Sequence, residues 1–196
     1  MRRRTFDWLM SGGGVVVTVV LIVAGVLLFA GYSFANNTVH TQLSAQKIFF
    51  PPAGSEAITS LPKADQTAIN PYAGEQLVNG AQAKVYAENF IGVHLSEVAG
   101  GQTYAQVSGK AIQDPTNTKL ADQANVLFKG TALQGMLMTS YAFWQFGQIA
   151  LIAMWAAFGL AAIMAIFTIL GFWHLRKVDK DVELKEPSLH LHRATA

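Results

Sequence analysis

Two long runs of apolar residues without an ionisable side chain limit the fold of this chain more than any other feature. The first covers residues 15–35 and the second covers residues 149–173, which are 21 and 25 residues long. A helix needs about 20 apolar residues to cross the hydrocarbon core of a bilayer, where every backbone polar group must be paired. Both runs therefore predict transmembrane helices. Two buried helices of a soluble core are the alternative, but such helices normally carry a polar stripe.

The composition favours a membrane protein and argues against several other classes. Hydrophobic residues make up 52% of the chain and charged residues 13%, about half of the roughly 25% typical of soluble domains. A net charge of +2 and no basic block longer than Arg2-Arg3-Arg4 do not suggest a nucleic-acid partner. The sequence contains no cysteine, which excludes disulfides, thiolate metal sites and thiol nucleophiles.

The positions of lysine and arginine predict the orientation in the membrane. Basic residues precede the first run at 2–4 and follow the second run at 176–180, whereas the nearest ones between the runs are Lys47 and Lys129. Because basic residues near helix ends concentrate on the cytoplasmic side, we expect both termini in the cytoplasm of a plasma-membrane protein.

The first run could instead be a cleaved signal peptide, because residues 2–4 are basic and Ser33-Phe34-Ala35 resembles a cleavage site. The apolar part of a signal peptide is about 7–15 residues long, however, and this run is longer. An uncleaved anchor is therefore the favoured interpretation.

The sequence thus predicts an all-α fold in which two transmembrane helices form an antiparallel hairpin, with a small helical extracytoplasmic domain inserted between them. The predicted parts are a cytoplasmic N-terminus (1–14), transmembrane helix 1 (15–35), the extracytoplasmic domain (36–148), transmembrane helix 2 (149–173) and a cytoplasmic tail (174–196) that is first helical and then disordered after Pro187.

Small residues recur along one side of each apolar run. The predicted helix-packing residues are Gly14, Thr18 and Gly25 in the first run and Ala157, Ala161 and Ala165 in the second. Such faces let two backbones approach closely, which favours packing of the two helices on each other, with packing against another protein as the alternative. Gly12-Gly13-Gly14 predicts a flexible entry to the first helix.

Helical periodicity continues beyond both runs into the domain between them. Val39 and Leu43 extend the first helix by about three turns until Pro51-Pro52 ends it, because proline cannot donate a hydrogen bond within a helix. Leu133 and Leu137, followed by Tyr141 and Trp144, give a matching helix over 131–146 that enters the second run.

The rest of the domain is divided by proline, glycine and capping residues. The predicted elements are an extended loop over 51–79, a helix from Asn79 to Val98 ended by Gly100-Gly101, a helix from Thr103 to the break at Asp114-Pro115, and a helix over 118–129 closed by Gly130. Asn79 with Gln82, and Thr103 with Gln106, have the spacing of capping boxes.

No pattern of catalytic or metal-binding residues stands out. His40 and His94 lie in the domain and Glu88 and Glu97 could join them, but no HxxxH, HExxH or GxSxG motif occurs. The two runs have no ionisable residue, which argues against an ion or proton path. We therefore expect no catalytic residues, no metal and no cofactor.

Aromatic residues gather in the domain just above the predicted membrane. The candidate contacts for a partner or lipid are Phe49, Phe50, Tyr72, Tyr86, Phe90, Tyr141 and Trp144. One interpretation is a groove for a lipophilic molecule between the protruding helix pair and the helix over 79–98. The alternative is that these side chains form the core of the domain and the aromatic belt at the membrane interface.

Three segments carry a resemblance to known sequences: 46–52 (QKIFFPP), 81–95 (AQAKVYAENFIGVHL) and 128–147 (FKGTALQGMLMTSYAFWQFG). On these segments the chain resembles a family of small two-pass actinobacterial membrane proteins of unknown function. The resemblance implies the same topology and supplies no mechanism. Some members are labelled aromatic ring-opening dioxygenases, which would imply iron, and no His/carboxylate triad in this sequence supports that label.

Taken together, the residues favour a non-catalytic accessory protein that docks on another membrane or envelope protein. Small-residue helix faces, an aromatic-rich domain near the membrane and the lack of a catalytic pattern lead to this hypothesis. A lipid- or lipophile-binding protein of the envelope is the second hypothesis, and an enzyme is the third.

Overall fold

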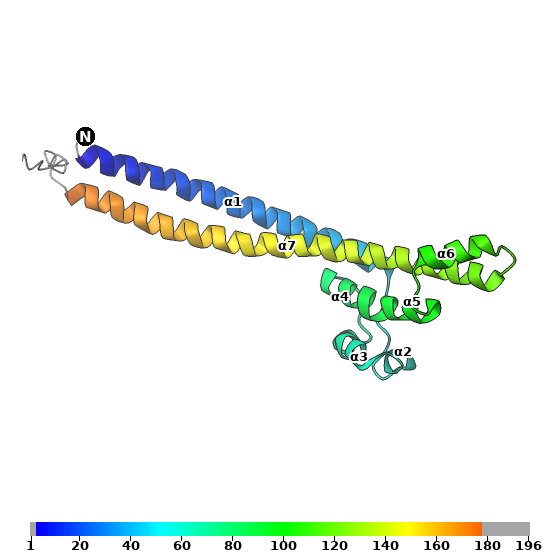
Figure 1. The fold of residues 1–196 in the computed structure, drawn as a ribbon. Helices are drawn as coiled ribbons and strands as arrows, with labels where there is room; N and C mark the ends of the chain where they lie inside the picture. The colour runs from blue at the N-terminus through cyan, green and yellow to red at the C-terminus, as the bar shows by residue number, and fades with distance from the viewer. Residues whose placement is uncertain (1–2, 178–196) are drawn as a thin grey trace, which may run out of the picture. The chain divides into compact units, whose positions relative to one another are not determined.

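The computed structural model describes residues 3–177, and the regular elements in that range are helices joined by short connections (Figure 1). The elements are α1 (Arg3–Gln46), α2 (Glu56–Thr59), α3 (Lys63–Ile69), the 3₁₀ turn η1 (Asn70–Tyr72), α4 (Gly80–Val85), the π-helix η2 (Tyr86–Ile91), α5 (Gly92–Ala99), α6 (Tyr104–Gln113) and α7 (Thr118–Lys177). An isolated bridge between Phe49 and Gln76 does not extend into a strand within 3–177. The prediction of an all-α fold is confirmed for the described residues.

The two longest helices contain the two apolar runs. α1 has 44 residues and α7 has 60, and both are long and apolar enough to cross a membrane. Only 11% of the apolar stretch of α1 and 17% of that of α7 is buried. A core helix of a soluble protein would be buried on most of its surface, so the low burial agrees with two helices that face an apolar solvent.

The chain divides into two compact units, and both long helices contribute to each of them. Unit 1 contains residues up to Phe29 together with those from Ile152 onward, and unit 2 contains Ala30–Leu151. The remaining helices, α2 to α6, all belong to unit 2.

In unit 1 the two long helices touch through glycines. A Cβ atom built on Gly25 would lie 2.6 Å from Cε1 of Phe158, and one built on Gly171 would lie 2.6 Å from Oγ of Ser11. Gly14 is in equally close contact with the Thr168 side chain. These distances leave no room for a side chain at the three glycines, so the backbone itself forms the packing surface.

Buried and half-buried positions in unit 1 follow a regular spacing of alternately three and four residues. On α1 they are the buried Ser11, Gly14 and Gly25 and the half-buried Thr18, Leu21 and Leu28; on α7 they are the buried Met154, Ala157, Ala161 and Thr168 and the half-buried Met164 and Gly171. This is the spacing of a coiled-coil seam, in which two helices wind around each other with a left-handed twist.

Unit 2 contains a core to which the segment after α1 contributes most of the large side chains. Its fully buried members include Phe50, Ile58, Ile69 and Leu77, each at most 2% exposed, and they pack with Val39, Leu43 and Leu137 of the long helices. The prediction of a loop over 51–79 that packs on other elements was wrong where α2, α3 and η1 form, which together cover 14 of its 29 residues. α2, α3 and η1 are too short to give a periodic pattern, and the prolines between them begin or separate helical turns rather than exclude them.

Two predicted interruptions of the long helices are absent from the structure. Gly130 was expected to end a helix, but α7 continues through it because Leu95 of α5 packs into the space that a side chain would fill. Gly12-Gly13-Gly14 was expected to be a flexible entry, yet all three lie inside α1. A glycine inside a helix costs about 1 kcal/mol relative to alanine, and at Gly14 and Gly130 close packing offsets that cost.

The predicted helix ends inside the domain agree with the structure. The side chain of Asn79 accepts from the Gln82 backbone at 2.9 Å, and Thr103 and Gln106 form a reciprocal capping box. Gly100 adopts the left-handed conformation, with φ of 57°, and ends α5 as expected. Beyond Lys177, the predicted tail lies outside the described residues.

Candidate functional site: a groove between the two long helices

Four of the seven aromatic residues proposed as contacts form one column inside the core of unit 2. Phe50 lies 5.4 Å from Tyr72 and 5.2 Å from Tyr86, and Tyr86 lies 5.0 Å from Phe90, measured between ring centroids. Phe90 continues the column to His94 at 4.5 Å. Phe50 is only 2% exposed. This arrangement corresponds to the alternative interpretation, a structural core, and a direct contact of Phe50 with a partner or lipid is ruled out in this state.

The other three aromatic residues lie elsewhere. The rings of Tyr141 and Trp144 are 6.3 Å apart on α7, and Lys84 Nζ lies 5.2 Å above the Tyr141 ring. Trp144 packs directly on Gly80 at the start of α4. Phe49 is 56% exposed, so it is the one member of the seven that the structure leaves mainly accessible.

The part of the location proposed for a lipid cavity that surrounds Ala83 and Ala87 is filled, whereas a hollow of about 360 Å³ lies further along, between Leu95 of α5 and Leu127 of α7. Ala83 and Ala87, on the helical segment that follows Asn79, are completely buried and belong to the same cluster as Leu137 of α7. Gln134 of α7 donates from Nε2 to the Ala87 carbonyl at 3.1 Å. The Ala87 carbonyl also accepts a hydrogen bond from the Gly92 amide at the end of the π-helix. The Gln134 side chain therefore connects α7 to the π-helix.

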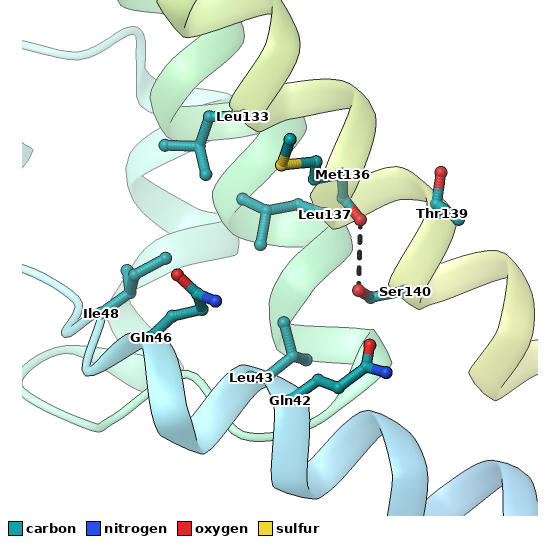
Figure 2. A pocket seen from close by; sticks show the side chains of 9 residues that line it. All are labelled: Gln42, Leu43, Gln46, Ile48, Leu133, Met136, Leu137, Thr139 and Ser140. Carbon is teal, nitrogen blue, oxygen red and sulfur yellow. Dashed lines mark hydrogen bonds between the residues drawn. The ribbon is translucent and has the colours of Figure 1, made fainter.

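A groove lies instead between the last turns of α1 and the middle of α7 (Figure 2). It has a volume of about 320 Å³. The lining residues are Gln42, Leu43, Gln46 and Ile48 from α1 and the residues after it, and Leu133, Met136, Leu137, Thr139 and Ser140 from α7. Figure 2 shows the aliphatic side chains of the two segments pointing toward each other across the groove.

A second hollow continues the groove toward the apolar runs. It has a volume of about 190 Å³, shares Gln42, Thr139 and Ser140 with the first hollow, and adds Thr38, Val39 and Phe143. The two hollows together form one elongated depression, here called the α1–α7 groove.

The α1–α7 groove is lined by apolar and neutral polar groups without a charged side chain. Thr139 Oγ1 donates to the Gly135 carbonyl at 2.9 Å, and Ser140 Oγ donates to the Met136 carbonyl at 3.1 Å. Both hydroxyl protons are therefore used within α7, which leaves only their acceptor capacity. The side-chain amides of Gln42 and Gln46 have no hydrogen-bond partner among the described residues.

The titratable residues of unit 2 do not converge on a reactive centre. Among residues 3–177, no group of three or more histidine and acidic side chains is placed to hold a metal ion. His40 is exposed, and Nδ1 of His94 lies 2.7 Å from the Phe90 carbonyl oxygen, where it completes the aromatic column. Burial raises the pKa of the Tyr86 phenol above its usual range, which keeps this side chain neutral inside the column.

The structure places the predicted helix-packing residues in unit 1. Gly14, Gly25, Ala157 and Ala161 are buried there, and Thr18 is half-buried with its hydroxyl donating to the Gly14 carbonyl at 2.7 Å. Ala165 is half-buried, as is its neighbour Met164, which has the regular spacing of the seam.

Sequence reasoning did not identify most of the groove residues. Leu43, Leu133 and Leu137 were recognised only as a helical pattern, and Thr139 and Ser140 were not singled out. The sequence signal that could have identified them is the recurrence of neutral polar or methionine side chains every three or four residues. It occurs on the two helical segments that extend beyond the apolar runs.

Comparisons of the whole chain with protein-family models, with curated proteins and with solved structures give no match.

Proposed function

We propose that this chain is a non-catalytic two-pass protein of the plasma membrane that presents unit 2 outside the cytoplasm as a docking module for another membrane or envelope protein. In this proposal the apolar parts of α1 and α7 form a transmembrane hairpin, and both termini lie in the cytoplasm. The resemblance to small two-pass actinobacterial membrane proteins agrees with that topology.

The apolar surface of unit 1 supports insertion into a bilayer. Large side chains there are mostly exposed, for example Leu27 at 68% and Val16 at 63% on α1, and Trp155 at 68% and Phe167 at 64% on α7. Exposed apolar area on this scale is unfavourable in water by roughly 25 cal/mol per Å² and carries no such penalty in lipid.

The observation that carries the docking proposal is an exposed apolar surface on α6 and the first turns of α7, far along the chain from both apolar runs. Tyr104 and Phe128 pair with ring centroids 5.6 Å apart, yet they remain 40% and 57% exposed. Ile112 is a separate exposed apolar side chain on α6, at 76%. An aromatic pair exposed on a polar domain is typical of protein–protein contact sites.

The test is affinity purification of the tagged full-length protein in mild detergent, followed by identification of co-purifying proteins. We expect one partner in a fixed ratio, and we expect the double variant Tyr104→Ser/Phe128→Ser to lose it. Phe49→Ser is the matched control, because Phe49 and Phe128 are almost equally exposed, at 56% and 57%. Repeated recovery of the protein alone, or loss of the partner in the control only, contradicts the docking surface.

A further inference from the structure

We propose that the α1–α7 groove binds a hydrocarbon chain of a bilayer lipid, which enters from the extracytoplasmic surface of the membrane. This inference rests on the membrane insertion proposed above, and it adds a ligand site that the docking function does not require.

The end of the groove that is lined by Thr38 and Phe143, here called its lower end, lies close to where the two apolar runs end. Thr38 follows the end of the first run at Ala35 by three residues, and Phe143 precedes the start of the second run at Ile149 by six. At a rise of 1.5 Å per residue, these positions are only about 5 and 9 Å from the ends of the runs. The polar layer on each side of the hydrocarbon core is about 5–7 Å thick, so the groove opens at lipid headgroup level.

An aromatic pair marks the same level. The rings of Phe34 and Phe143 meet edge to face with centroids 6.2 Å apart, and Phe143 is also part of the groove lining. Phe34 is 65% exposed and lies at the end of the first run. Phe34 is thus a large apolar side chain exposed beside Phe143, so this end of the groove is continuous with the apolar surface of the first run.

The size of the groove suits a chain better than a helix. Its two hollows measure about 320 and 190 Å³, whereas a helix with its side chains is about 10–12 Å across. A partner helix would lie across the groove and leave its floor empty. From Thr38 to Ile48 the groove follows α1 for about 15 Å, a path along which an extended hydrocarbon chain can lie.

The lining also selects an apolar occupant. Leu43, Leu137 and Leu133 line it with aliphatic groups, and Met136, which is 68% exposed, offers an adaptable thioether at the opening. Neither hollow is lined by a lysine or arginine, so a headgroup phosphate finds no cation there. The amides of Gln42 and Gln46 are available to donate to a neutral oxygen such as an ester carbonyl. The lipid is therefore recognised through its acyl chain and ester region, with no selection for an anionic headgroup.

The experiment uses the full-length protein in vesicles of dioleoylphosphatidylcholine that contain a phosphatidylcholine with a photoactivatable diazirine in one acyl chain. Cross-linked residues are then mapped by mass spectrometry. We expect labelling at groove residues, in particular Leu133 and Met136, in addition to general labelling of the apolar runs. A second probe, a photoactivatable phosphatidylglycerol, carries an anionic headgroup. If the phosphatidylcholine probe labels the groove at least as strongly as this second probe, the result supports recognition through the acyl chain.

A groove-filling variant makes the test specific. Thr139 lines both hollows and is exposed, so Thr139→Trp adds bulk to the groove without replacing a core side chain. We expect labelling of the groove to fall by about tenfold, equivalent to about 1.4 kcal/mol of binding free energy. Thr131→Trp, the same substitution at an exposed position of α7 outside the groove, should leave the labelling unchanged.

The outcomes separate this inference from the proposed function. Labelling of the apolar runs without labelling of the groove overturns the lipid site and leaves membrane insertion intact. Absence of labelling at both places contradicts membrane insertion itself. Groove residues that cross-link to a co-purifying protein instead of lipid identify a protein occupant and overturn the proposal, as does equal labelling of Thr139→Trp and the parent protein.

Discussion

The same two helices pack in different ways in the two units. In unit 1 glycines, alanines, Ser11 and Thr168 share the contact with larger residues such as Met154, and Gly25 touches the ring of Phe158 directly. In unit 2 the contact involves Val39, Leu43 and Leu137. Small residues allow the backbones to approach closely, and larger residues hold them apart. The difference explains why the groove occurs in unit 2 and why shorter helices are needed there to complete a core.

In the proposed topology unit 1 lies in the bilayer and unit 2 in water, and these two solvents account for the choice of residues. In a bilayer the hydrophobic effect does not bring two helices together, so close van der Waals contact and small side chains must do so. In water the burial of Leu77, Ile58 and similar side chains stabilises the fold directly. Substitutions should therefore affect unit 2 through lost apolar burial and unit 1 through lost close approach.

The largest expected effect is the removal of a buried side chain from the core of unit 2. Leu77 is fully buried, and Leu77→Ala should lower the free energy of unfolding of unit 2 by about 3 kcal/mol, through lost burial and the cavity left behind. Urea unfolding of the detergent-solubilised protein, followed by near-UV circular dichroism, measures this. Ile112→Ala is the control: Ile112 is 76% exposed, and the change should be within about 0.5 kcal/mol. Equal effects of the two variants would contradict the assigned core.

A second substitution tests the close approach in unit 1. Gly25→Leu forces a side chain into the ring of Phe158 and should destabilise the pairing of α1 and α7 by about 1–3 kcal/mol. The yield of a disulfide between cysteines introduced at Ser11 and Gly171, whose side-chain positions meet in unit 1, reports this pairing. Gly31→Leu on the same helix has open space around it and should give the yield of the parent. A high yield in Gly25→Leu would show that the small-residue seam does not hold the helices together.

A smaller effect is expected where α7 supports the π-helix of unit 2. Gln134→Leu removes the hydrogen bond to the Ala87 carbonyl and should reduce stability by about 1 kcal/mol. Hydrogen exchange of backbone amides around Gly92 should accelerate, since the same carbonyl accepts from that residue. Gln145→Leu, an exposed position on α7, should not accelerate exchange there. If both variants behave alike, the bond does not stabilise the π-helix.

The smallest predicted effect depends on pH. Burial raises the pKa of Tyr86, so the folded state favours the neutral phenol more than the unfolded state does. The corresponding stability is present below the unfolded pKa of about 10 and is lost as the pH rises above it. Melting temperatures measured between pH 8 and 11 should fall less steeply for Tyr86→Phe than for the parent. The exposed Tyr104→Phe should follow the parent curve, and a parallel decline in all three proteins would contradict this assignment.

The large-scale features of the fold could be predicted from the sequence because they depend on composition and periodicity. The apolar runs, the helix starts at Asn79 and Thr103 and the stop at Gly100 all follow from local rules that the residues obey on their own. Gly130 could not be assigned in this way. Its role inside α7 depends on Leu95, which is distant in sequence and fills the space above it.

The candidate site was less accessible to sequence reasoning. Aromatic residues were the natural candidates for ligand contacts, but Phe50 and Tyr86 pack in the core, where their rings meet edge to face. The groove is a gap between the side chains of α1 and α7. It is lined by residues such as Gln42 and Met136, which belong to no recognisable binding motif. A hollow of this kind depends on the separation of two helices, which no single segment of sequence encodes.

The central claim, that unit 2 lies outside the cytoplasm between two membrane spans, can be tested with single-cysteine reporters because the chain has no cysteine of its own. Thr116, in the exposed turn between α6 and α7, and Thr5, near the start of α1, are both exposed. In intact cells a membrane-impermeant maleimide should label Thr116→Cys, and it should label Thr5→Cys only after the membrane is permeabilised. Labelling of Thr5→Cys in intact cells, with Thr116→Cys protected until permeabilisation, would contradict the proposed topology.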